Sequence, residues 1–320
     1  MINFRLANSL KECAEAFNLA NSIFSQNPTD QNYKTMLWAK NGNEQPEQLM
    51  LAVDGSKIIG LVRMCPSQMI WREEKFLISG LTSICIDVNY RGKNLGRGLM
   101  ETTIKHCDEK GLDATFLVAR RAVDHFYLKF GFIGASSYPS IIIEEIPKIL
   151  GTEILFRDLN PKNSEEYFIH HNHAYRESLR IGRHVSDFWH YTPERLEFLD
   201  LTFQEIWSDG ELIGYVFHGK DYVEEIAFAD RISDIKILST MNKLKNILSE
   251  KLMLKIPHQH KLVSSLRNCD VIFMSRQCRY GGHMLRWNRK KKELPINIGT
   301  YKKLNGLDKP FFALSKLDEL

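Results

Sequence analysis

The spacing of apolar residues in the first half of the chain predicts an alternation of strands and helices. Leu10, Cys13 and Phe17 recur at helical spacing within residues 9–25. Two short apolar runs, 48–53 and 57–63, flank an Asp-Gly turn signal and predict a hairpin. The remaining expected elements are a first strand ending near residue 6, a strand over 76–88, an amphipathic helix over 95–110, a strand over 114–119 and a short helix before Gly131.

The second half of the chain repeats parts of this pattern. Residues 153–160 echo residues 2–8, and residues 207–216 echo the hairpin sequence at 53–62. A strand at 222–228, a helix at 233–251 and late strands at 271–275 and 283–288 complete the expected elements. The repeat predicts a second domain of the same kind as the first.

The most informative segment is the strand-to-helix junction at residues 84–99. Such a junction leaves the first amides of the helix unpaired at the positive end of the helix dipole, so that it suits a phosphate. Gly92 and Gly96 allow a sharp turn and a close approach to the main chain, and Arg91, Lys93 and Arg97 add positive charge. The spacing fits neither a P-loop nor a Rossmann fingerprint, and an ordinary basic junction stays open as an alternative.

Two motifs in this half resemble those of the GNAT superfamily of acyl-CoA-dependent N-acetyltransferases. Residues 91–96, Arg-Gly-Lys-Asn-Leu-Gly, resemble its Gln/Arg-x-x-Gly-x-Gly/Ala motif, and Phe126-Tyr127-x-x-x-Gly131-Phe132 resembles its second signature. Asn94 stands where the family prefers glycine. Asparagine is the residue other than glycine that best tolerates a left-handed conformation. We therefore expect the phosphate-binding turn at residues 91–97, called the cradle below, to tolerate this change.

The resemblance implies a fold class, a co-substrate and a set of site residues. The fold class is α/β (α+β), with two GNAT-like domains that each contain a mixed, mainly antiparallel twisted sheet flanked by helices. The function implied is acetyl transfer from acetyl-CoA to a primary amine by direct attack, with Tyr127 as general acid toward the departing thiolate. The expected cofactor-binding residues are Ile86, Asp87, Val88, Arg91, Gly92, Lys93, Asn94, Leu95, Gly96 and Arg97, and no metal is expected.

We expect three parts along the chain: a catalytic domain over 1–150, a degenerate GNAT-like domain over 151–293 and a C-terminal tail over 294–320. The second domain lacks a cradle because its junction at 229–235 has no glycine and carries Asp230 and Asp234, which would satisfy the amides and repel pyrophosphate. Residues 79–84, and residues 175–183 followed by Trp189, are similar to segments of the enhanced-intracellular-survival (Eis) type of GNAT protein.

Several alternatives stay open at the level of the sequence. The general base could be His125, Glu73, Glu74 or the carboxylate after Leu320. Cys85 could form an acyl-enzyme, although a packed thiol is the better interpretation. The chain could also be a non-catalytic CoA-binding sensor or scaffold, or an RNA-associated protein using residues 286–292. His170, His171 and His173 are expected at the surface or at a helix cap rather than on a metal.

Composition bears on whether the protein binds nucleic acid, spans a membrane or is secreted. A net charge of +4, from 43 basic and 39 acidic residues, does not favour nucleic acid as a partner. No apolar run is long enough for a membrane span, no signal peptide is visible and the six cysteines form no paired motif, so we expect a reduced protein of the cytoplasm. The partner expected is an amine-bearing acceptor of unknown identity, and the sequence leaves the oligomeric state open.

Overall fold

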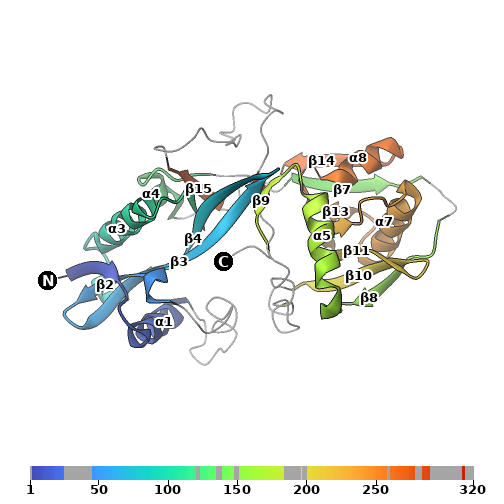
Figure 1. Cartoon of the computed structure of the whole chain (residues 1–320). Helices are drawn as coiled ribbons and strands as arrows, with labels where there is room; N and C mark the ends of the chain where they lie inside the picture. The colour runs from blue at the N-terminus through green and yellow to red at the C-terminus, as the bar shows by residue number, and fades with distance from the viewer. Residues whose placement is uncertain are drawn as a thin grey trace.

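The protein is built on two β-sheets that lie side by side and are joined by a long hairpin (Figure 1). The structure, a computed structural model, describes residues 2–24, 45–119, 123–134, 139–147, 151–183, 196, 200–257, 260–277, 283–288 and 312–313. Within these ranges no helix is both long and apolar enough to cross a membrane.

The first sheet has seven strands along its main path and two more at its edge. In spatial order the path is β1 (Ile2–Leu6), β2 (Leu49–Asp54), β3 (Lys57–Trp71), β4 (Glu74–Ile86), β5 (Ala114–Val118), β15 (His283–Trp287) and β6 (Ile133–Gly134). Strand β9 (Leu179–Ile181) extends the edge of β3, and β16 (Phe312–Ala313) pairs with β9. Along the main path every pairing is antiparallel except that of β4 with β5.

Helices cover both faces of this sheet because its strands carry apolar side chains on both faces. On β2, Met50 and Ala52 pack under α3 (Leu95–Glu109), whereas Leu49 and Leu51 pack under α1 (Leu10–Phe24). Strands of this kind, apolar on both faces, belong in the middle layer of a helix-sheet-helix arrangement. A third helix, α4 (Asp124–Leu128), follows β5.

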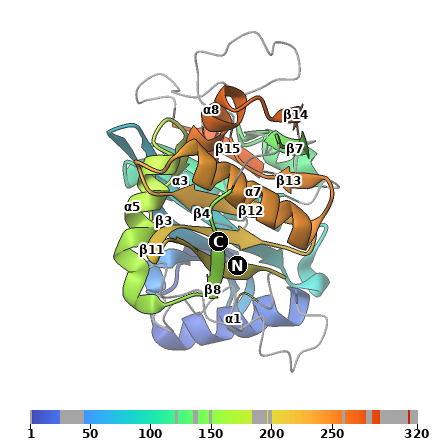
Figure 2. The same cartoon turned by 90° about the vertical axis from the view of Figure 1, so that its right-hand side faces the viewer.

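The second sheet repeats the order of the first. Its path is β8 (Leu155–Asp158), β10 (Thr202–Ser208), β11 (Glu211–His218), β12 (Tyr222–Phe228), β13 (Leu252–Leu254), β7 (Pro139–Glu145) and β14 (Ile272–Gln277). Again only the fourth and fifth strands along the path, β12 and β13, are parallel. Helices α7 (Asp234–Leu248) and α8 (Lys261–Asn268) pack on one face, and α5 (Ser164–Ala174) packs on the other (Figure 2).

The two sheets exchange one strand. The place between the fifth and last strands of the path is occupied by β15 in the first sheet and by β7 in the second. Thus β7 lies before residue 150 and pairs in the second sheet, while β15 lies far beyond residue 150 and pairs in the first. Each sheet therefore needs a strand from the other part of the chain.

The predicted fold class is confirmed: two mixed, mainly antiparallel sheets are each flanked by helices. The predicted hairpins, the helices that begin near residues 10, 95 and 234 and the late strands are present. Four features have no counterpart in the predicted elements: β7, β13, α8 and the extension of β3 to Trp71. The expectation for the histidines is wrong for His170 and His171, which are buried on α5 because that helix packs both ring side chains inward.

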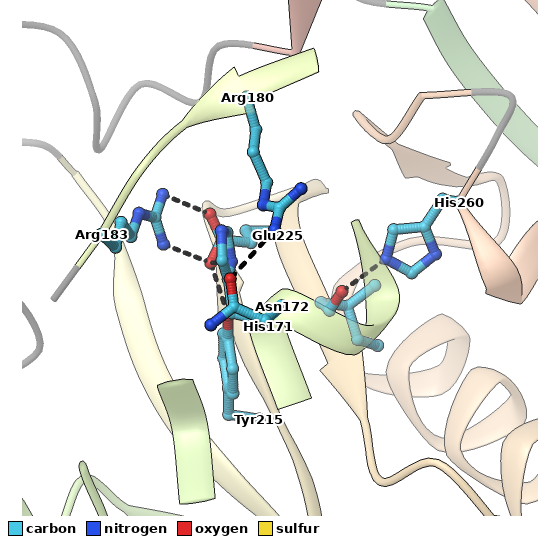
Figure 3. A network of polar contacts seen from close by, with 8 residues as sticks. His171, Asn172, Arg180, Arg183, Tyr215, Glu225 and His260 are labelled. Atoms are coloured by element: carbon cyan, nitrogen blue, oxygen red, sulfur yellow. Dashed lines mark hydrogen bonds and ion pairs between the residues drawn. The ribbon is translucent and has the colours of Figure 1, made fainter. Parts of the chain in front are cut away.

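A buried ion pair joins the two sheets. Arg183, two residues after β9, donates from both terminal guanidinium nitrogens to the carboxylate of Glu225 on β12, at 2.7 Å each (Figure 3). Tyr215 on β11 donates to the same carboxylate at 2.7 Å, and His171 Nδ1 lies 3.4 Å from it. Burial alone would raise the pKa of the Glu225 carboxyl, but Arg183 and His171 hold that pKa well below its usual value.

We predict that Arg183→Met lowers the free energy of unfolding at pH 7 by about 3–5 kcal/mol, because it leaves the Glu225 charge buried without its partner. Denaturant unfolding of the full chain measures this. In the wild type the folded-state pKa of Glu225 is depressed, so the contribution of the pair is present above the unfolded pKa, about 4.3, and is lost as the pH falls below it.

In Arg183→Met the pKa of the Glu225 carboxyl rises, because burial still acts on it and the arginine that lowers it is gone. The penalty should therefore shrink as the pH is lowered from 7 toward about 5. The double variant Arg183→Met/Glu225→Gln is the matched control and should be less destabilised than the single variant at pH 7. An Arg183→Met penalty that is small and independent of pH would show that the pair does not hold the sheets together.

Candidate active site

The first sheet opens at its two central parallel strands. Strands β4 and β5 pair only at Ile78–Ala114, Ser79–Thr115 and Gly80–Phe116. Beyond Gly80, β4 continues to Ile86 along β3 alone, while β5 continues along β15 from the other part of the chain. Beyond the third pair, the main-chain N–H and C=O groups of β4 and β5 that face each other are thus unpaired and can bind a ligand.

A β-bulge coincides with this opening. Leu61 of β3 faces Cys85, but Arg63 faces Thr82, so β4 carries one extra residue between them. Ser83, within the bulge, has a left-handed backbone with φ of 50°. Such a conformation costs about 1–2 kcal/mol in a residue other than glycine, and bulges often redirect strands beside functional sites. The bulge bends β4 just where it leaves β5.

A cavity of about 740 Å³ occupies the opening. Its walls come from the C-terminal part of β4 (residues 80–86), from Phe116, Leu117 and Val118 of β5, and from Tyr127. Ile23 and Phe24, at the end of α1, line it on the other side of the sheet. The lining also includes Arg91 and Val123. The residues of α1 and the bulge residues Thr82 and Ser83 were not foreseen, because no motif in the sequence marks a register shift or a helix end as a wall.

Tyr127, from α4, is largely buried in the wall of the cavity, beside Phe126 and Phe132. Desolvation by burial raises the pKa of its hydroxyl to about 12. That hydroxyl forms no hydrogen bond with any residue that the structure describes. It is therefore a protonated donor throughout the physiological pH range and is free to act on a bound molecule.

The predicted amide cradle lies between β4 and α3. Within the described ranges, the five consecutive backbone N–H groups of residues 92–96 have no acceptor. The Arg97 N–H donates to the Asn94 carbonyl at 3.1 Å, so the open stretch ends at Gly96. Asn94 adopts the left-handed conformation, with φ of 57°, and its side chain makes no capping hydrogen bond. The backbone tolerance expected of Asn94 is therefore what the turn uses.

The charged side chains around the cradle differ in their partners. Arg91 Nε donates to the Ile86 carbonyl at 3.2 Å and so lies against the end of β4. Lys93 Nζ lies 5.2 Å from the centre of the Tyr90 ring, and Arg97 is paired with Glu101 at 2.8 Å. Asp87 caps the turn that follows β4 by accepting from the Asn89 N–H.

The remaining cofactor-binding candidates lie within the cradle or just before it. Ile86 ends β4 and lines the cavity, and Leu95 opens α3 with its side chain partly buried against the core. Val88 is exposed in the turn between them. Asp87 is further fixed by Lys57 at 3.0 Å, and the hydrogen bond from Asn89 together with Lys57 lowers the pKa of the Asp87 carboxyl.

Cys85 lines the same cavity but is a buried thiol. Desolvation raises its pKa to about 12, so the thiolate is scarce at neutral pH. At the equivalent junction of the second sheet, between β12 and α7, the Ser233 hydroxyl caps the helix by accepting from the Lys236 N–H at 3.4 Å. Asp230 does not cap this helix but pairs with His173 and Lys261.

The candidate bases lie away from this cavity where the structure describes them. Glu73 and Glu74 occupy the outer tip of the β3–β4 hairpin, and Glu74 is roughly 23 Å along the strand from Leu81. His125 is exposed on α4 and is not part of the cavity lining. The carboxylate after Leu320 and Trp189 lie outside the described residues.

The basic run at 286–292 begins with residues that have partners inside the protein. Arg286 forms a two-point ion pair with Asp108 at 2.7 and 2.8 Å, and Trp287 packs edge-on against Phe76. Asn288 donates to the Leu112 carbonyl, and residues 289–292 lie outside the described residues. These contacts give Arg286 and Trp287 a structural role in β15.

Comparison with solved structures shows where this fold occurs. A conserved protein of unknown function from Enterococcus faecalis V583, described as a probable N-acyltransferase, superposes with a TM-score of 0.66 at 11% identity, over 90% of this chain and 72% of that one. A GCN5-related N-acetyltransferase from Anabaena variabilis gives 0.62 at 15%, and Eis1 from Mycobacterium abscessus gives 0.58 at 15%, each over 90% of this chain and 73% of the other. At such identities the likeness establishes the fold.

The sequence itself matches one family profile. A search of curated protein sequences finds no significant match. The profile described as the acetyltransferase (GNAT) domain matches residues 4–134, a range that contains the cradle, the opening between β4 and β5 and Tyr127. Residues 4–134 of this chain therefore belong to the GNAT acetyltransferase family.

Proposed function

We propose that the protein is an acetyl-CoA-dependent N-acetyltransferase that moves an acetyl group to a primary amine by direct attack. The observation that carries the proposal is the cavity through the first sheet, with Tyr127 in its wall and five open amides beside it. Acyl transfer as such follows from the family of residues 4–134.

The cradle suits the pyrophosphate of coenzyme A. Five adjacent N–H groups at a helix N-terminus form a concave set of donors and carry the positive end of the dipole of α3. At Gly92, where φ is +80°, no protein atom lies within 4 Å of the position that a Cβ would take, so a phosphate can approach the main chain there. Arg91 and Lys93 add positive charge at the same end of the cavity.

The unpaired inner edge of β4 suits the rest of the donor. Amides of a pantetheine arm pair with main-chain groups, and residues 81–86 offer such groups beyond the last pair with β5. Acetyl-CoA supplies the acetyl group as a thioester at the end of this arm. We place the arm along β4, on the route from the cradle to Tyr127.

Tyr127 is proposed as the general acid. When the neutral amine nitrogen bonds to the carbonyl carbon and the carbon–sulfur bond breaks, the sulfur takes a proton from the Tyr127 hydroxyl in the cavity wall. The nitrogen gives up one proton to solvent water, and a proton from solvent restores the Tyr127 hydroxyl. Burial raises the pKa of the Tyr127 hydroxyl to about 12, so the hydroxyl is protonated at neutral pH and can donate.

We also propose that each chain has one donor site. The second sheet has the same strand order as the first, but its junction at 229–235 has no glycine, and Asp230 and Asp234 make that junction acidic. The second half then serves as a degenerate domain that supplies β15 to the wall beside the cavity. Direct attack is favoured over an acyl-enzyme because the Cys85 thiol is protonated at neutral pH.

We predict that Tyr127→Phe lowers kcat for acetyl transfer about 10²–10⁴-fold, because the variant keeps the ring packing and loses only the proton donor. Release of free thiol from acetyl-CoA measures kcat, and calorimetry measures the Kd for acetyl-CoA. The Kd should stay within about twofold of the wild type, since the hydroxyl acts on the leaving group rather than on the bound donor.

A Tyr127→Phe variant with wild-type kcat would remove Tyr127 from the mechanism. If the wild-type protein binds acetyl-CoA but releases no thiol with any amine, the protein is a CoA-binding sensor or scaffold. Absence of acetyl-CoA binding would contradict the proposal as a whole.

We predict that Asn94→Gly leaves the Kd for acetyl-CoA unchanged within about twofold, because glycine adopts the same left-handed backbone without strain. Asn94→Ala is the matched contrast: alanine at this φ should cost about 1–2 kcal/mol and weaken binding by distorting the turn. Calorimetry and thermal unfolding measure the two effects. A loss of tenfold or more in Asn94→Gly would mean that the amide side chain itself binds the donor.

A further inference from the structure

The cavity has two ends, one on each face of the first sheet. One end lies on the face covered by α3, where the cradle precedes the first turn of that helix. Its lining residues Ile84, Ile86 and Tyr127 belong to the core under α3. Cys85, Ile23 and Phe24 belong to the core under α1, on the opposite face. If the donor enters from the cradle, the end that remains for the acceptor is the one lined by α1.

From this acceptor end we infer a substrate class: a primary amine carried on an apolar alkyl or aryl group. The inference rests on the proposed acetyl transfer and deepens it. It is carried by the side chains that line the two sheet faces at the opening, rather than by any motif.

The acceptor end is apolar. Phe24 and Ile23 from the last turn of α1 face the cavity together with Cys85 of β4 and Phe116 of β5. Contact with such a wall stabilises an alkyl or aryl group in proportion to the apolar area that leaves water. Aromatic side chains give the largest areas of this kind, and the acceptor end has two of them.

The distribution of charge in the cavity wall also favours an acceptor with a single amine on an apolar group. Among the lining residues that the structure describes, Arg91 is the one with a fixed charge, and it lies at the end of β4 next to the cradle. A diamine or polyamine would bring a second ammonium group toward described walls that hold no carboxylate. Removing such a group from water without a partner is costly.

A single neutral amine nitrogen does have polar neighbours. Thr82 is partly exposed in the lining, and the buried Ser83 hydroxyl has no hydrogen-bond partner among the described residues. Thr82 borders the bulge and Ser83 lies within it. The polar groups are thus few and close together, as in a site that orients one nitrogen beside an apolar body.

The test compares two amines of similar length, n-hexylamine and 1,5-diaminopentane, which differ mainly in the second ammonium group. The assay measures thiol release by the full chain at saturating acetyl-CoA, and calorimetry measures the Kd for acetyl-CoA separately. We expect kcat/KM to be at least about tenfold higher for hexylamine, within the range that apolar pockets achieve.

Phe24→Ala should lower kcat/KM for hexylamine about five- to tenfold, mainly through KM, and should leave both kcat/KM for the diamine and the Kd for acetyl-CoA nearly unchanged. Leu10→Ala is the matched control, because Leu10 is on the same helix, is 68% exposed and is not in the cavity lining. It should change none of these values.

Preference for the diamine, an equal effect of Phe24→Ala on both amines, or acetyl-CoA binding without turnover of either amine would overturn this inference. In each of these cases acetyl-CoA still binds, so the donor site stands. Failure of the wild type to bind acetyl-CoA would overturn the proposed function and this inference with it.

Discussion

The short parallel pairing of β4 with β5 is the constraint on which the candidate site depends. The pairing of the two strands ends after three residue pairs. Beyond that point β4 continues beside β3, and β5 continues beside β15. The bulge at Ser83 bends β4, and β15 holds β5 on the far side. An opening in the middle of a sheet leaves main-chain N–H and C=O groups without hydrogen-bond partners, which costs free energy. The opening between β4 and β5 therefore indicates a ligand that pairs with those groups.

The two halves have the same strand order but different chemistry. They differ at one turn: the side chain of Asn94 makes no capping hydrogen bond before α3, whereas the Ser233 hydroxyl caps the start of α7. The exchange of β7 and β15, together with the Arg183–Glu225 ion pair, makes each half depend on the other for its packing. The second half also contributes to the first sheet directly, since β15 pairs with β5 beside the opening.

Local patterns in the sequence predicted much of the fold and part of the site. The periods of apolar residues predicted the hairpins and the helices α1, α3 and α7, and the motif around Tyr127 placed that residue in the wall of the cavity. The strand exchange was not predictable, because β7 and β15 carry the same apolar signal whichever sheet they join. Short elements such as β13, with three residues, give too little periodicity to be recognised. The acceptor end escaped notice because Phe24 is distant in sequence from every motif.

The most direct measurement of the central claim is a crystal structure of the protein with coenzyme A. The account predicts pyrophosphate oxygens within hydrogen-bond distance of the N–H groups of residues 93–96, and the sulfur in the cavity beside the Tyr127 hydroxyl. Coenzyme A bound at the start of α7, or bound outside the opening between β4 and β5, would contradict it.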